Sequence, residues 1–413
     1  MEAPVTAWGA RWCADGVGAG RRLVLALLAL VLAAATWLPL VHLLYTPRLA
    51  DFWARDGIPP LTRLIANRHL ALWTEPALLA AELARMRGSN PEWDFMGRTF
   101  LGLALANMAR RDPASAAGYL AVLDRILEAT LTVEREQGNL HFLMSYAVGS
   151  PFSASPARSL FVDGEIALML AARQFVAADE RWRQPLAERI DRVTASIASA
   201  PCLMAESYPD ECWTFDHAVG LAATQISDLL DGRDHGPLRR AWLAHVRRTL
   251  LEERTGLLYA CCTYKGERRD GPEGTTLWLA AHCLQLLDPA FAADQYARAK
   301  RELARDFYGL GYAREWPPGW AGAEDVDSGP IIPGLELSAG STGLAFLGAA
   351  SFADAEFLGK LLANLQFGAF PKADGDRLKY CGSNQVGDAV LLYALVQGPL
   401  WREVQGRTAG GTP

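Results

Sequence analysis

The sequence predicts an all-α protein, in which one membrane-spanning helix precedes a closed double ring of helical hairpins, the (α/α)6 toroid. Three observations predict this fold. About a dozen segments beyond residue 50 carry apolar residues at helical spacing, and convincing period-2 strand patterns are lacking. No repeat of about 34–47 residues is detectable, which disfavours a solenoid of helix pairs. The chain of 413 residues also shows no low-complexity linker that would divide the domain.

The apolar segment 23–45 is the predicted transmembrane helix. At about 1.5 Å per residue it is long enough to cross a hydrocarbon core about 30 Å thick. Arginines precede it, so the positive-inside rule places residues 1–22 in the cytoplasm and the main domain on the outer, periplasmic or extracytoplasmic side. A cleaved signal peptide is the alternative. Its apolar stretch is normally about 7–15 residues, and Tyr45-Thr46-Pro47-Arg48 is a poor cleavage site.

Start and stop signals divide residues 50–402, the predicted toroid domain, into helices. Asp112-Pro113 and Asp288-Pro289 each combine an N-cap with a first-turn proline, and apolar residues at helical spacing follow both. Pro237 opens another helix, and a further one ends at Gly368.

Two long stretches, 138–158 and 311–343, do not have a simple helical pattern. Both are rich in glycine, proline, serine and aromatic residues, and loops of this length in a compact domain are usually functional or disordered. Residues 403–413 are predicted to be a flexible C-terminal tail.

The composition excludes some functions. Lysine and arginine are scattered among acidic residues at a formal net charge of −6, so there is no nucleic-acid-binding footprint. The cysteines and histidines show no ligand pair with standard zinc spacing, and we expect no metal site. No G-x-G-x-x-G, H-E-x-x-H or G-x-S-x-G motif occurs, and no cofactor is expected. A homo-oligomer is compatible with the sequence.

Five polar clusters stand where helical patterns begin or end. Acidic residues are common in first helical turns, where the helix dipole stabilises them by about 0.3–1 kcal/mol. Capping is therefore the simplest role for any single cluster. The clusters are Asn90 to Asp94, Asp163 with Glu165, Tyr208 to His217, Tyr264 with Glu273, and Glu315 to Asp327. Asp388 is a further acid that enters an apolar helix.

Asp216-His217 is the cluster that points most strongly to chemistry. It lies between Phe215 and an almost wholly apolar run, so at least one ionisable group should be poorly solvated. A carboxylate beside an imidazole in a dry pocket forms a general acid–base pair, because burial and pairing shift both pKa values. The alternative is a core histidine whose hydrogen bonds are satisfied, next to a helix cap. Asp325 and Asp327 crowd with Glu324, and crowded carboxylates bind a cation or share protons.

Several motifs occur in an order and spacing that resemble the catalytic domain of bacterial linalool dehydratase/isomerase, over about residues 90–400. They are Tyr208-Pro209-Asp210, Arg240-Ala241-Trp242-Leu243, Gly256-Leu257-Leu258-Tyr259, Thr275-Thr276-Leu277-Trp278 and Asp288-Pro289-Ala290-Phe291. The resemblance implies an (α/α)6 toroid outside the cytoplasm that needs no metal or organic cofactor. It also implies loss of water from, or rearrangement of, an allylic terpene alcohol. The family's catalytic Cys-Glu pair, second Cys and His fall on Ser207-Tyr208, Asp216 and Glu165, so carboxylates replace thiols and imidazole.

The leading hypothesis is therefore a lyase or isomerase of the hydro-lyase type that acts on an isoprenoid or other lipophilic alcohol. Asp216 would be acid or base, His217 would tune it, and Glu165 would oppose it across the central cavity. The catalytic residues are predicted to be Asp216, His217, Glu165 and Asp327, and the substrate-binding residues Asp163, Tyr208, Trp213, Tyr264, Glu273, Glu315, Trp316 and Asp325.

Two alternatives stay open. The first is a glycoside hydrolase or lyase that acts on a glycan, in which Asp216 pairs with Glu273, Glu315 or Asp327 beside stacking tryptophans. Fold alone does not decide between these enzymes. The second is a non-enzymatic, membrane-anchored subunit in which the acids are caps and surface groups.

Overall fold

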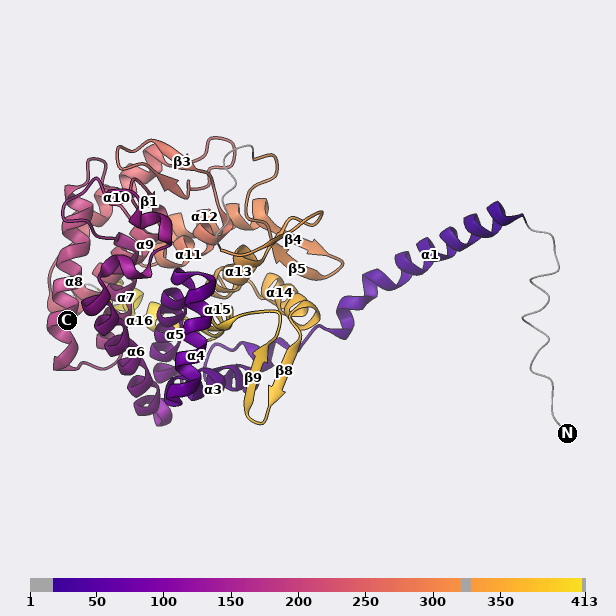
Figure 1. Cartoon of the computed structure of the whole chain (residues 1–413), viewed down its shortest axis with the longest axis horizontal. Helices are drawn as coiled ribbons and strands as arrows, with labels where there is room; N and C mark the ends of the chain where they lie inside the picture. Colours follow the sequence, from indigo (N-terminus) through magenta and orange to yellow (C-terminus); the bar gives the residue numbers. More distant parts are fainter. Residues whose placement is uncertain (1–17, 321–327, 411–413) are drawn as a thin grey trace.

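The computed structural model describes residues 18–320 and 328–410, and its globular body is the predicted double ring of helices (Figure 1). Six inner helices form a closed circle, in which each helix contacts the next and the last contacts the first. In chain order they are α5 (Pro91–Arg111), α7 (Leu160–Val176), α9 (Thr214–Asp231), α11 (Gly274–Leu284), α13 (Ala339–Ser351) and α15 (Gln385–Val396). The all-α toroid is confirmed.

Outer helices surround this circle. They are α3 (Pro60–Thr74), α4 (Pro76–Ser89), α6 (Ala116–Gln137), α8 (Glu180–Ser199), α10 (Gly236–Thr249), α12 (Pro289–Leu303) and α14 (Ala355–Gly368), and the short α2 (Leu49–Phe52) leads into α3. The two layers differ in their apolar pattern. The outer helix α8 buries Trp182, Leu186 and Ile190 along one stripe, whereas every residue from Leu160 to Phe175 in the inner helix α7 is buried.

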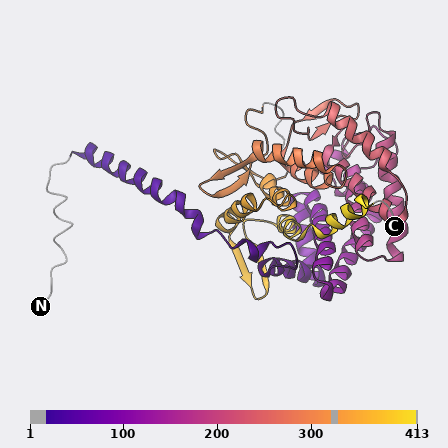
Figure 2. The same cartoon turned by 180° about the vertical axis from the view of Figure 1, so that it is seen from behind.

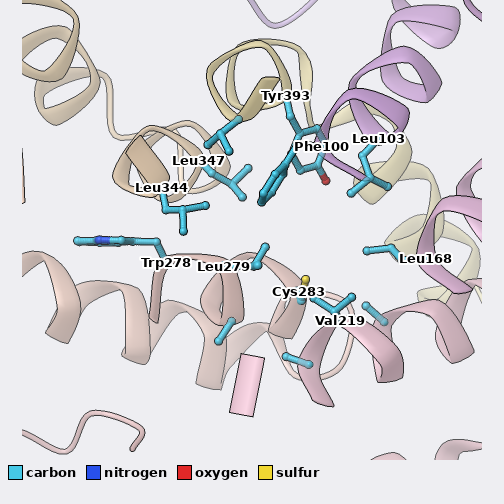
Figure 3. Packing of buried hydrophobic residues seen from close by; sticks show 14 of the residues in the cluster. Phe100, Leu103, Leu168, Val219, Trp278, Leu279, Cys283, Leu344, Leu347 and Tyr393 are labelled. Carbon is cyan, nitrogen blue, oxygen red and sulfur yellow. The ribbon is translucent and has the colours of Figure 1, made fainter. Parts of the chain in front are cut away.

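The interior of the circle is filled by apolar side chains from all six inner helices (Figure 3). Phe100, Leu168, Val219, Leu279, Leu347 and Tyr393 each come from a different helix, and all are buried. The toroid therefore has a packed core rather than an open central channel.

The last helix, α16 (Pro399–Ala409), crosses the end of the ring formed by the C-terminal ends of the inner helices. The Trp401 indole stacks on the His282 ring of α11 at 4.5 Å between centroids, and its Nε1 donates to the His282 carbonyl at 3.1 Å. Gln225 of α9 donates to Thr408 at 3.0 Å. The prediction of a flexible tail from residue 403 is wrong up to Ala409, because the buried Leu400, Trp401 and Val404 pin the helix to the ring.

Short strands, which the sequence did not predict, occupy the loops before four of the inner helices. They form one three-stranded and three two-stranded antiparallel sheets among the described residues: β1 (Cys212–Trp213), β2 (Cys261–Cys262) and β3 (Arg268–Asp270); β4 (Ala304–Phe307) and β5 (Leu310–Ala313); β6 (Ile331–Ile332) and β7 (Leu337–Ser338); β8 (Pro371–Asp374) and β9 (Arg377–Tyr380). Strands of two to four residues are too short to show an alternating pattern. The 138–158 loop contains the 3₁₀ helices η4 (Asn139–Phe142) and η5 (Ser145–Val148), and η3 (Pro113–Ser115) precedes α6.

The apolar helix near the N-terminus, α1 (Ala19–Val41), projects away from the body and continues into the 3₁₀ helix η2 (His42–Leu44) (Figures 1 and 2). Within the described residues, 20–44 is the one helical stretch long and apolar enough to cross a membrane, with a mean hydropathy of 2.5 and no part of it buried. A signal sequence has the same properties. The helix starts before residue 23, where the sequence placed its beginning.

Candidate active site

A cavity of about 1060 Å³ opens at the N-terminal ends of the inner helices. All six helices contribute first-turn residues to its wall: Glu92 and Trp93, Phe161, Phe215 and Asp216, Thr275 and Thr276, Gly340 and Thr342, and Gly387 and Asp388. Phe100, Leu279 and Leu344 from the packed core lie below these residues and also line the cavity. The first turns of all six inner helices therefore face one cavity, and Asp216 is among the acids that line it.

Asp216 lies on the cavity wall in the first turn of α9 and is 1% exposed. Its Oδ1 has no hydrogen-bond partner among the described protein groups. Burial raises the pKa of Asp216 well above its usual range, and the nearby charges of Glu165 and Glu92 raise it further, while Ser207 opposes the rise. The raised pKa favours the protonated form of Asp216, which can donate a proton to a group in the cavity.

Glu92 is the second carboxyl group at this end of the cavity. Asn90, the N-cap of α5, accepts a hydrogen bond from the Glu92 amide at 2.8 Å, which fixes the first turn. The Tyr208 hydroxyl donates to Glu92 and accepts from the Met144 amide at 2.8 Å. Burial raises the pKa of Tyr208, so it stays a neutral donor. The Tyr146 ring stacks on Tyr208 at 5.0 Å, which places two aromatic rings beside the carboxylate.

Glu211 and Arg269 add an ion pair to the same end, at 3.2 Å. Glu211 also accepts from the Tyr146 hydroxyl at 3.0 Å and from the Trp213 indole at 3.3 Å. Burial raises the pKa of Glu211, and the charge of Arg269 opposes that rise. Glu273 and Asp270 line the cavity beside this pair. This polar end therefore combines carboxyl groups, a guanidinium and aromatic faces.

The other end of the cavity is apolar. Its wall is formed by Ile332, Leu337, Leu361, Leu365, Ala369 and Val386, which come from β6, β7, α14, the segment after α14, and α15. Asp388 is the acid on this side, and Arg68 bonds it at 3.0 Å. Burial raises the pKa of Asp388 to about 6 in spite of the opposing Arg68 charge. The lining thus combines a polar group of side chains with a mostly apolar one.

His217 does not pair with Asp216, contrary to the prediction. Its Nε2 accepts from the Ala205 amide at 2.8 Å, and its Nδ1 lies 2.7 Å from the Trp213 carbonyl, to which it donates. Burial lowers the pKa of His217 to about 4. The ring also stacks on Trp242. The alternative of a satisfied core histidine is therefore correct, because the backbone occupies both ring nitrogens.

Glu165 lies near Asp216 but does not oppose it across the cavity. It is in the second turn of α7, the neighbour of α9 in the inner ring, and it is not among the residues that line the cavity. The Thr99 hydroxyl donates to its Oε2 at 2.6 Å. Burial raises the pKa of Glu165 to about 8, so it is largely protonated at neutral pH. Glu165 therefore lies beneath the cavity wall, where its charge can raise the pKa of Asp216.

Asp163 belongs to a structural ion-pair network rather than to the cavity wall. Arg158 bonds it at 2.7 and 2.9 Å, and Arg189 bonds it as well. Both arginines also bind Glu134, at 2.9 Å each, and this network joins α7 to α6 and α8. The predicted role of Asp163 in substrate binding is wrong, because arginines occupy its oxygens.

The other predicted residues fall into four groups. Tyr208, Trp213 and Glu273 line the cavity, whereas Tyr264 and Trp316 are half-buried and lie outside its wall. Glu315 lines the wall, but it accepts from the Thr275 amide at 3.0 Å, from the Thr275 hydroxyl at 2.6 Å and from Ser338, so it holds the starts of α11 and α13 together. Asp325 and Asp327 lie outside the described residues.

Sequence reasoning did not single out Glu92, Tyr146, Glu211, Arg269 or Asp270 as site residues, although all five line the cavity. Glu92 carried a usable signal, because it starts an apolar helix in the same way as Asp216. Arg269 and Asp270 lie on the unpredicted strand β3. In the described parts of the chain, no three His, Cys, Asp or Glu side chains are grouped so that they could hold a metal ion.

No protein-family model matches the chain. Solved structures that resemble it include an unsaturated glucuronyl hydrolase from Bacillus sp. GL1, with 14% identity, a TM-score of 0.49, and coverage of 72% of this chain and 84% of that one. An inactive α-1,6-mannanase variant from Salegentibacter sp. HEL1_6 in complex with α-1,6-mannotriose has 11% identity, a TM-score of 0.49, and coverage of 74% and 89%. A GH76 α-mannanase from Bacteroides thetaiotaomicron has 10% identity, a TM-score of 0.45, and coverage of 75% and 87%.

These proteins are toroid enzymes that act on glycans, rather than linalool dehydratases. Similarity at this level carries no argument about substrate. The toroid is confirmed, and the linalool dehydratase/isomerase relationship stays a prediction.

Proposed function

We propose that this protein is a membrane-anchored enzyme that cleaves a C–O bond by acid–base catalysis, with Asp216 as the general acid. The observation that carries the proposal is the state of Asp216: a buried carboxyl whose pKa is raised well above its usual range, whose Oδ1 has no protein partner among the described residues, and which lines a large cavity. A carboxyl group that keeps its proton near pH 7 can protonate a leaving oxygen. A purely structural role would not offset the free-energy cost of burying this carboxyl oxygen without a hydrogen bond.

The first candidate reaction is cleavage of a glycosidic bond, by hydrolysis or by elimination. The polar end supports it, because carboxyl groups beside aromatic rings are the usual equipment of such sites. Asp216 would protonate the glycosidic oxygen as the C–O bond breaks. Glu92, held by Tyr208, would act as the ionised partner that attacks the anomeric carbon, activates water or removes a proton. Tyr146 and Trp213 offer rings for stacking against sugar faces.

The second candidate is dehydration or isomerisation of a lipophilic alcohol, and the apolar end of the cavity supports it. Asp216 would protonate the hydroxyl, water would leave, and Glu92 would take a proton from the adjacent carbon. In this reading Asp216 does the work that the resembled family assigns to a thiol.

Asp216→Asn tests the shared step. We expect turnover of either glycan substrates or isoprenoid alcohols such as linalool and geraniol by the wild type, and a loss of about 10²- to 10⁴-fold in kcat for the variant. Its thermal midpoint should not fall, since an amide replaces a buried carboxyl whose raised pKa favours the neutral form. The control, Asp163→Asn, should lower the midpoint because it leaves Arg189 with one partner fewer.

Two results would contradict the proposal. One is the absence of turnover in both substrate panels with folded wild-type protein. The other is unchanged kcat in Asp216→Asn. The first result would favour the non-enzymatic subunit, and the second would remove Asp216 from the role of general acid.

A further inference from the structure

Most of the large apolar side chains that are exposed on the globular body gather near the end of α1. We call this group the rim patch: Phe307 and Tyr308 at the β4–β5 turn, Ile332 on β6, and Phe367 and Phe370 at and after the end of α14. Their exposed fractions run from 40% to 67%. Exposed aromatic groups of this kind mark a surface that another apolar phase covers.

The end of α1 is seated on this patch rather than joined to it by a free linker. The Tyr45 ring meets Phe367 edge-on, at 5.1 Å between centroids. The His42 imidazole rests on the backbone of Gly309, where an added Cβ would lie 2.4 Å from the ring. Gly309 also has a φ of +86°, which only glycine adopts easily. These contacts orient the patch relative to the axis of α1.

The contacts also set the level of the patch along the helix. Leu38 and Val41 of α1 line a groove together with Phe307, Tyr308 and Phe367. At about 1.5 Å per residue, Leu38 lies roughly 9 Å and Val41 roughly 5 Å before the end of the apolar stretch at residue 44. A bilayer that α1 spans would therefore reach the tip of the β4–β5 hairpin.

We infer that the rim patch docks on the bilayer that α1 spans, with the β4–β5 tip inserted among the lipid headgroups. The inference rests on the proposed anchor. Interfacial elements bury apolar side chains about 5–10 Å into the boundary between headgroups and acyl chains, which is the depth that the α1 contacts give. Aromatic residues suit this boundary because it is neither fully apolar nor fully aqueous.

The docked face is also the face on which the cavity opens. The β4–β5 hairpin follows the outer helix α12, and Phe370 follows the outer helix α14, so both lie at the end of the toroid where the inner helices begin. Leu337 and Asn364 line both the groove beside α1 and the active-site cavity, and Ile332 lines the cavity. The apolar end of the cavity is thus continuous with the surface at the membrane.

This continuity indicates which class of substrate the cavity would accept. A lipid-linked molecule can keep its chain against the bilayer and the apolar wall while its polar head reaches Asp216 and Glu92. Both candidate reactions accept such a substrate, as a lipid-linked glycan or as a long isoprenoid alcohol. A fully water-soluble sugar would leave the apolar end of the cavity without a partner.

Photolabelling of the full chain tests the docking. The protein is reconstituted in phosphatidylcholine vesicles that contain a phosphatidylcholine with a diazirine near the headgroup, and labelled peptides are mapped by mass spectrometry. We expect labels on α1 and on the peptides that contain the β4–β5 tip and the end of α14. The double variant Phe307→Asp/Phe370→Asp should lose the labels on the body. Leu230→Asp is the matched control, because Leu230 is an exposed apolar residue in the last turn of α9, at the closed end of the ring.

The outcomes separate the docking from the anchor. Labels on α1 but none on the rim patch would overturn the docking and leave the anchor in place. Labels spread equally over the patch and the Leu230 peptide would also overturn it, since they would indicate non-specific contact. No label on α1 would overturn the anchor and the docking together. All variants change exposed residues, so unchanged thermal midpoints are expected and show that each sample is folded.

Discussion

At the scale of single residues, three acids near the start of α9 are electrostatically coupled. Asp216, Glu165 and Glu92 lie close enough that the charges of the other two raise the pKa of Asp216. Tyr208 donates to Glu92, and Thr99 donates to Glu165. Asp216 has no comparable donor on its Oδ1 among the described groups, and its raised pKa favours the protonated form at the cavity wall.

Glu165 gives the clearest pH prediction. Burial raises its pKa in the folded protein from 4.5 to about 8, so between these values the folded state holds a proton that the unfolded state has lost. Stability must therefore fall as pH rises through this window, by about 1.4 kcal/mol per pH unit for one proton. Glu165→Gln removes this proton. We expect its thermal midpoint to decline less steeply than that of the wild type between pH 5 and pH 8.

The difference between the two slopes reports the proton on Glu165 together with any change that the loss of its charge makes to the pKa of Asp216. Parallel curves for wild type and Glu165→Gln would mean that the Glu165 pKa is not raised. A kcat that is more sensitive to Glu165→Gln at high pH than at low pH would add that the Glu165 charge acts on Asp216.

At the scale of elements, the inner helices set the site and α16 holds their far ends. His282, on α11, bonds Ser351 of α13 and Tyr393 of α15 at 2.7 Å each, and Trp401 of α16 stacks on its ring. His282 thereby links α11 to α13 and α15, and α16 packs against this linked group. The cavity at the opposite ends of these helices depends on that closure for its shape.

Trp401→Ala tests the role of α16. Loss of a buried tryptophan costs about 3–5 kcal/mol, because it removes apolar contact and leaves a cavity. We expect this decrease in the free energy of unfolding, measured by denaturant titration in detergent. Arg402→Ala, at the exposed neighbour, should change it by about 0.5 kcal/mol or less. Equal effects of the two variants would mean that α16 packs only loosely on the ring.

The pattern of helix signals predicted several elements well. Asp288 caps α12 through a 2.9 Å bond from the Phe291 amide, and α14 ends at Gly368, as expected. Asp112-Pro113 was less accurate, because a 3₁₀ turn follows it and Asp112 instead binds Arg63 of α3. A capping signal depends on adjacent residues, so the sequence can predict it. An ion pair with a residue far along the chain cannot be predicted in this way.

At the scale of the whole molecule, the position of α1 decides on which side of the membrane the proposed activity would take place. The predicted arrangement is an uncleaved anchor with residues 1–22 in the cytoplasm and the toroid outside. After expression in a bacterial host, the full chain should stay in the membrane after an alkaline wash. Protease added to spheroplasts should digest the toroid. A mature N-terminus near residue 46 would show cleavage of a signal peptide, and a protected toroid would reverse the orientation.

The sequence by itself determined the helical class, the apolar N-terminal helix and the identity of Asp216 as a buried acid at the start of an inner helix. These features depend on neighbours a few residues away: apolar spacing, caps, and the apolar run after Asp216. Only the tertiary structure decided which groups meet. It brought Glu92 and Tyr208 together and paired Asp163 with Arg189. It also placed both ring nitrogens of His217 in hydrogen bonds with the backbone. Periodicity shows which face of a helix is buried, but the partner that covers this face comes from a distant part of the chain, which no local pattern identifies.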